Sequence, residues 1–109
     1  MTLAPLSGLA ILAHTRGVAA AYAARMLATL GASVTLVEGP EGTPLRREPP
    51  FLPGTQTSAL FAYLAAGADS WTCDLASTDG HSALGARLSE ADILIDDTPL
   101  IERDALGLD

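Results

Sequence analysis

Polar side chains with reactive or ligand-binding groups follow the apolar runs of this chain. An imidazole can exchange a proton near neutral pH, a guanidinium matches a phosphate, and carboxylates can hold ribose hydroxyls or metal ions. The segments concerned are His14–Gly17, Glu38-Gly39, Asp74 and Asp96–Thr98. Ligands of open parallel sheets bind at the carboxyl ends of the strands, so we expect these segments to gather at one edge of the fold.

The turn after the first apolar run meets only half of the dinucleotide-binding pattern, which asks for G-x-G-x-x-G and an acidic residue about 20 residues further on. Glu38 stands where the acidic residue would be, but the turn itself contains Gly17 as its one glycine. A nicotinamide or flavin cofactor is therefore the less favoured interpretation. The favoured one is that Gly17 eases the start of a helix.

The histidines and acidic residues do not meet the requirements of a catalytic or metal site. His14 could act as a general base, but no motif marks a serine or cysteine nucleophile, so a packed or solvent-facing ring is favoured. His81 is expected to be exposed near a helix start. Asp92 precedes the last apolar run whereas Asp96 and Asp97 follow it, so these carboxylates should not converge on a metal. We predict no catalytic residue and no metal site.

Arg46-Arg47 is a pair of positive charges in a segment rich in proline. Two interpretations stay open. The guanidinium groups are either phosphate contacts or exposed charges that balance Glu41 and Glu48.

Four apolar runs predict short strands with helical patterns between them. The predicted strands are Leu9–Ala13, Val34–Val37, Trp71–Leu75 at an edge, and the buried run Ile93–Ile95. The predicted helices run from Val18 to Leu30, from a Ser58 cap to near Gly67, from a Ser77 or Thr78 cap through Leu88, and from Thr98-Pro99 to Gly107. In the first helix, Val18, Tyr22, Met26 and Leu30 recur at helical spacing and are expected to form the buried stripe.

This order of elements predicts an α/β fold, a Rossmann-like open, mostly parallel sheet of about four strands with flanking helices. Residues 1–109 are expected to form a single domain. Repeated prolines and glycines make residues 39–55 a long loop without helix or central strand. An open sheet leaves an edge with unpaired backbone groups, which invites pairing with more chain or another subunit.

The composition of the 109 residues narrows the possible partners. Thirteen acidic against six basic residues give a net charge of −7, which repels nucleic acid and anionic membranes. No apolar run approaches the roughly 20 residues that span a bilayer, and no targeting segment is visible. The single cysteine, Cys73, excludes an internal disulfide. We expect a cytoplasmic protein without nucleic-acid or membrane partners.

Six short motifs, in order, resemble the N-terminal part of the family III CoA-transferases, the group of formyl-CoA transferase, carnitine CoA-transferase and alpha-methylacyl-CoA racemase. The family's patterns are P-L-x-G-[IVL], L-G-A-x-V-I-K-[IV]-E, G-D-P-x-R, D-L-K-x-x-x-G, A-D-[VI]-[LV]-[IV]-E-N and L-G-[LF]. The matching segments here are Pro5–Leu9 with Thr15, Leu30–Val34 with Val37-Glu38, Glu41–Arg46, Asp74-Leu75 with Gly80, Ala91–Ile95, and Leu106–Leu108. The resemblance covers nearly the whole chain.

The resemblance implies a Rossmann-like CoA-binding domain of a longer protein that forms an interlocked dimer. In that family the nucleotide lies over the first two βα turns, and an aspartate beyond the equivalent of Asp109 takes up the acyl group as a mixed anhydride. Several positions that would hold CoA differ here. The family's V-Q is Gly17-Val18, its basic residue after the strand-two glutamate is Gly39, its N-R-G-K-R is Ala65–Asp69, and its E-N-F is Asp96–Thr98.

These differences predict weak or absent CoA binding, because CoA brings about four negative charges that need donors. The expected contacts are the backbone at Gly17, Val18 and Gly39 and the side chains of Arg16, Arg46 and Arg47. No tightly bound cofactor and no catalysis by the chain alone are expected. A second copy or another CoA-transferase-type chain is the expected partner. Two alternatives stay open, a non-enzymatic scaffold that associates through its sheet edge and a fragment of a nucleotide-cofactor oxidoreductase.

Overall fold

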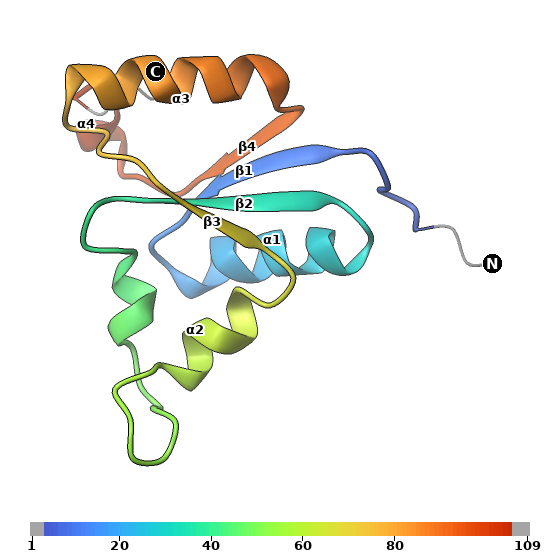
Figure 1. Cartoon of the computed structure of the whole chain (residues 1–109), viewed down its shortest axis with the longest axis vertical. Coiled ribbons are helices and arrows are strands. Elements are labelled where there is room, and N and C mark those ends of the chain that lie inside the picture. Colours follow the sequence, from blue (N-terminus) through green and yellow to red (C-terminus); the bar gives the residue numbers. More distant parts are fainter. Residues whose placement is uncertain (1–3, 106–109) are drawn as a thin grey trace.

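The computed structural model describes residues 4–105 and shows one parallel sheet of four strands in that range, in the order β3-β2-β1-β4 (Figure 1). The strands are β1 (Ala10–His14), β2 (Ser33–Glu38), β3 (Asp69–Thr72) and β4 (Ile93–Asp96). The helices are α1 (Val18–Thr29), the 3₁₀ helix η1 (Pro44–Arg47), α2 (Ala59–Leu64), α3 (Thr78–Glu90) and α4 (Leu100–Arg103). The predicted fold class, an open parallel α/β sheet with flanking helices, is confirmed.

The strand order places the ends of β1, β2 and β4 side by side. Ala13 pairs with Leu36 of β2 and with Ile95 of β4, and His14 pairs with Asp96. Because all neighbours are parallel, their carboxyl ends share one edge of the sheet. Chain order reverses between β1 and β4, and open α/β sheets take ligands at the carboxyl ends of the strands near such a point.

Helices cover both faces of the sheet, with α1 and α2 on one face and α3 on the other (Figure 1). One buried cluster, which includes Ile11, Ala24 and Val34, packs with Leu27 and Phe61 beneath the sheet. The second cluster lies beneath α3 and consists of Leu12, Val37, Cys73, Leu75 and Leu84. Among residues 4–105, no helix is long and apolar enough to cross a membrane.

The face of α1 predicted to be buried is in fact the outer one. Val18, Tyr22, Met26 and Leu30 are 49, 45, 44 and 42% exposed, whereas Ala21 and Ala24 pack inward. Small side chains face the sheet because they let the helix approach it closely. The prediction failed because apolar residues surround almost the whole helix, so that helical spacing alone fits more than one stripe.

The predicted helix boundaries are partly confirmed. Ser58 and Ser77 cap α2 and α3 by accepting hydrogen bonds from the N–H groups of Phe61 and Gly80. Gly31 follows α1 with a φ of +105°, a conformation that glycine adopts at little cost. Pro99 is the N-cap of α4 rather than its first helical residue. The predicted end of α4 at Gly107 lies outside the described residues.

Three predictions from the sequence are wrong, one about the loop, one about the bounds of β3 and one about the burial of β4. Residues 39–55 contain the 3₁₀ helix η1, which begins at Pro44 because the fixed φ of proline suits a first helical turn. Strand β3 ends at Thr72, and Cys73 and Leu75 are buried beyond it under α3. Strand β4 is only half buried, with Ile93 40% exposed, because it forms the second edge of the sheet.

Candidate functional site

A cleft of about 300 Å³ opens at the carboxyl ends of β1 and β2. Its walls come from the turn after β1, the end of β2 and the loop that leads into η1, and they include His14, Arg16, Gly39, Glu41 and Arg47. This volume is at the lower end of the range of small-molecule pockets. Three of the six predicted contact residues, Arg16, Gly39 and Arg47, therefore share one cleft.

Glu38 fixes one wall of the cleft with a buried carboxylate. Arg46 donates two hydrogen bonds to it, from Nε at 2.6 Å and from Nη2 at 2.8 Å. The Thr43 N–H and the Ser70 hydroxyl donate further bonds at 2.9 and 2.7 Å. The bond from Arg46 is the main reason that the pKa of Glu38 is lowered to about 2. With these partners, Glu38 acts as an anchor for the loop rather than as a ribose ligand.

The contacts of Arg46 and Arg47 differ from both interpretations of the sequence. The Arg46 guanidinium pairs with Glu38 and lies over the Phe61 ring, 4.4 Å from its centroid. Arg47 faces the cleft and donates to the backbone carbonyl of Glu41 at 3.0 Å, not to a carboxylate. Arg46 is thus committed to the fold, while Arg47 keeps donors for a ligand.

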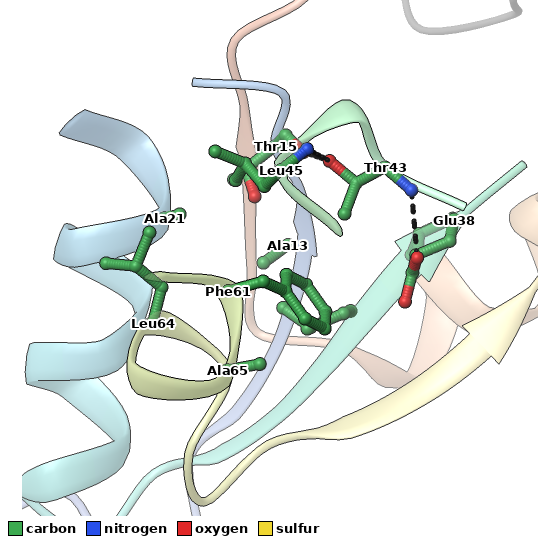
Figure 2. A pocket seen from close by; sticks show the side chains of 11 residues that line it. Ala13, Thr15, Ala21, Glu38, Thr43, Leu45, Phe61, Leu64 and Ala65 are labelled. Atoms are coloured by element: carbon green, nitrogen blue, oxygen red, sulfur yellow. Dashed lines mark hydrogen bonds between the residues drawn. The ribbon is translucent and has the colours of Figure 1, made fainter. Parts of the chain in front are cut away.

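Beneath the cleft, an apolar gap of about 10 Å³ lies between α1, α2 and η1, and Figure 2 shows the side chains around it. Leu45, Leu64 and Phe61 point into this gap (Figure 2). The Thr43 hydroxyl closes its upper side by donating to the Thr15 carbonyl at 2.8 Å. The volume is about that of one water-sized sphere, so the gap is a packing defect and not a ligand site.

The turn that leads into α1 binds a side chain of the chain itself. The Asp97 carboxylate accepts from the Gly17 N–H at 2.8 Å and from the Arg16 N–H at 2.9 and 3.0 Å. In Rossmann-type folds this is where a pyrophosphate receives backbone N–H groups. Val18 extends outward from α1 and does not line the cleft. The backbone donors at Gly17 are therefore already satisfied by an internal anion.

His14, Asp96 and Thr98 form a small network at the ends of β1 and β4. The His14 Nδ1 and the Thr98 hydroxyl lie 2.9 and 2.6 Å from Asp96 Oδ1. Burial raises the pKa of Asp96, but the bonds from Thr98 and His14 outweigh burial, so that the pKa is lowered overall. Arg103 of α4 lies on the other side, with Nε 3.6 Å from Asp96 Oδ2.

The remaining predicted groups do not join the cleft. Asp92 accepts from the Ala10 N–H at the opposite end of the sheet, as its place before β4 predicted. His81 is exposed at the residue level, although its ring contacts the Leu75 carbonyl. Within residues 4–105, no three histidine, cysteine or acidic side chains are arranged to hold a metal ion. Arg16 pairs with Glu102 of α4 at 2.7 Å, an exposed contact at the rim.

Sequence reasoning missed the contacts of Asp97 and Thr43. The sequence placed Asp97 at the ligand edge, within Asp96–Thr98, but did not show its bonds to the turn after β1, although its position after β4 was the signal for them. Thr43 precedes Pro44, and threonine before a proline at a helix start is a recognisable cap. Both residues hold loops together around the cleft.

The fold of this chain and its match to a known family define the class of protein to which it belongs. The open parallel sheet, with a cleft at the carboxyl ends of β1 and β2, is a Rossmann-like fold. Residues 6–109 match CoA-transferase family III. The chain belongs to that family, so the resemblance inferred from its motifs is confirmed.

Two relatives and one solved structure show how much of the family architecture is shared. The succinyl-CoA:(R)-benzylsuccinate CoA-transferase subunit BbsE of Thauera aromatica is 39% identical over 80% of this chain and 22% of its own length. A succinate–glutarate CoA-transferase of Agrobacterium fabrum is 34% identical, over 96% of this chain and 28% of its own length. A CAIB/BAIF family protein of Brucella suis superposes with a TM-score of 0.86 and 32% identity, over 96% of this chain and 29% of its own. The chain therefore spans less than a third of these proteins.

Proposed function

We propose that this chain is the CoA-facing N-terminal segment of a protein that transfers CoA between carboxylic acids, and that it does not catalyse the transfer alone. The observation that carries the proposal is the Glu38–Arg46 pair. It joins two of the family's motifs and fixes the wall of the cleft at the end of β2. Both named relatives act on succinate or its CoA thioester. We infer that dicarboxylic acids and their thioesters are the substrate class of the whole protein.

The proposed CoA site is weak because its donors are few. Arg16, Arg47 and the Gly39 backbone line the cleft, while Arg46 serves Glu38 and the Gly17 N–H serves Asp97. Ala68-Asp69 stands where the resemblance implies a lysine and an arginine. The phosphates of CoA therefore meet two arginine side chains instead of a full set of cations. No tightly bound cofactor is proposed.

Calorimetric titration of the chain with CoA tests this site. We expect a dissociation constant of about 0.1 mM or weaker, since only two arginines remain to pair with about four negative charges. Arg47→Ala should weaken binding about fivefold further, because a charge-assisted contact is lost. Arg25→Ala is the matched control, since Arg25 lies on α1 and bonds to the Tyr63 carbonyl. A submicromolar constant for the unmodified chain would contradict the proposal of a weakened site.

We further propose that the chain works in the cytoplasm with a second copy or another CoA-transferase-type chain. The edge strand β4 leaves Ile93 40% exposed at its start, and Leu100 and Ile101 of α4, beyond the other end of the strand, are 79 and 91% exposed. An unpaired edge and exposed apolar side chains favour association. A non-enzymatic supporting role would use the same edge strand. Sedimentation velocity should show self-association, and a monomer at high concentration would argue against it.

A further inference from the structure

The ring of His14 is held in one tautomer. Its Nδ1 lies 2.9 Å from Asp96 Oδ1 and 3.1 Å from the Thr98 hydroxyl. The Thr98 hydroxyl donates its own proton to the same Asp96 oxygen at 2.6 Å. An ionised carboxylate only accepts hydrogen bonds, and the lowered pKa of Asp96 keeps it ionised. The proton of the neutral ring must therefore sit on Nδ1, which leaves a lone pair on Nε2.

The other ring nitrogen remains available to a ligand. Among residues 4–105, no group forms a hydrogen bond to Nε2 of His14. The residue lines the cleft of about 300 Å³ together with Arg16, Gly39 and Arg47. Its side chain is 14% exposed, so the ring is packed in place and reaches the cleft with only part of its surface. A packed ring with a fixed tautomer presents one acceptor in a defined position.

We propose that His14 is a specificity-determining residue of the cleft, whose Nε2 accepts a hydrogen bond from a hydroxyl or amino group of a nucleoside. This rests on the proposed function, which places CoA in the cleft at the ends of β1 and β2. A phosphate at neutral pH offers only acceptors, so it gains nothing from an imidazole lone pair. The ribose hydroxyls and the adenine amino group are donors, and they fit this position.

The other residues that line the cleft fit an arrangement in which phosphate and nucleoside bind on different sides. Arg16 and Arg47 are donors and suit the phosphate side of a nucleotide. The Gly17 N–H at the entry to α1, close to a common phosphate position, already donates to the Asp97 carboxylate. A nucleotide in this cleft would therefore turn its phosphates toward the arginines and its nucleoside toward His14. Asp96 acts through His14 as a positioning residue, because it fixes the ring and its tautomer.

Two measurements on the full chain test the proposal. Nitrogen-15 NMR of the two histidine rings should show His14 with its proton on Nδ1, and Asp96→Asn should disturb that tautomer. Titration with adenosine should shift the His14 Nε2 resonance. His14→Phe should weaken adenosine about fivefold, the value of one lost hydrogen bond. His81→Gln is the matched control and should leave the affinity unchanged, since His81 does not line the cleft.

Each possible result of these measurements either supports or overturns the proposed role of His14. A wild-type His14 protonated on Nε2, absence of adenosine binding, or equal binding by His14→Phe would each overturn the proposal. If His14→Phe does not fold, the adenosine titration of the wild-type chain decides, because an unmoved Nε2 resonance overturns the role and a shifted one supports it. Submicromolar CoA binding would contradict the weakened CoA site of the proposed function but would leave the His14 tautomer unchanged. Failure of the proposed function can therefore be distinguished from failure of the role of His14.

Discussion

Gly80→Ala is expected to destabilise the chain by about 3 kcal/mol, because the site has no room for a methyl group. A Cβ at Gly80 would lie 1.7 Å from the backbone oxygen of Asp74 and 2.6 Å from its carbonyl carbon. Backbone atoms cannot move aside as a flexible side chain can, so the start of α3 must shift. That shift would break the cap in which Ser77 Oγ accepts from the Gly80 N–H at 2.9 Å. Urea unfolding monitored by circular dichroism measures the loss.

Gly85→Ala on the same helix is the control. No atom lies within 4 Å of a Cβ built at Gly85, so alanine fits there without contact. Replacing a glycine inside a helix by alanine should stabilise the chain by about 0.5–1 kcal/mol, through the backbone entropy of the unfolded state. The two substitutions are chemically identical and have opposite expected signs. Equal stability of both variants would contradict the close approach of Asp74 and Gly80.

Loss of the Glu38–Arg46 pair is the second large effect. The pKa of Glu38 is lowered from 4.5 to about 2 by the Arg46 bond and its other partners. The ionised form therefore stabilises the folded chain above about pH 4.5, and this contribution of about 3 kcal/mol disappears as the pH falls toward 2. Glu38→Gln should remove most of that part of the acid dependence. Stability measured by urea unfolding between pH 2 and 7 shows the difference.

Arg46→Ala should cost about 2–3 kcal/mol at neutral pH, because it leaves the Glu38 carboxylate buried without its cation. Glu38 is 3% exposed, whereas the Arg46 side chain is 45% exposed, so the cost comes mainly from the carboxylate. Arg47→Ala is the matched control, since Arg47 lies next in the chain and bonds only to a backbone carbonyl. An acid unfolding curve that is the same for Glu38→Gln and the unmodified chain would refute the anchoring role.

The sheet could be predicted because each buried strand is a short apolar run bounded by polar residues. Val34–Val37 lies within β2, and Ile93–Ile95 lies within β4. Helix α1 was located correctly but assigned the wrong inner face. Its inward positions are alanines, and small side chains are chosen by close packing against strands that are distant in sequence. No local pattern carries that information.

The sequence predicted where the site lies but not which residues contact one another there. The ends of the strands indicated His14, Glu38 and Asp96, and all three lie at the cleft or border it. Their partners come from 5 to 82 residues away, as with Thr43 and Glu38 or His14 and Asp96, and spacing cannot reveal such pairs. For Gly80, the sequence identified the residue but not the reason for it. The family motif marked it, and only the distance to Asp74 explains why glycine is required.

We propose that the chain has the family fold, offers few donors for phosphate and does not transfer CoA alone. The most direct test is a CoA-transfer assay with the purified 109-residue chain, succinyl-CoA and glutarate, in which glutaryl-CoA is measured by mass spectrometry. We expect no glutaryl-CoA above the level of a reaction without protein. Sustained formation of glutaryl-CoA that depends on the amount of chain added would contradict the central claim.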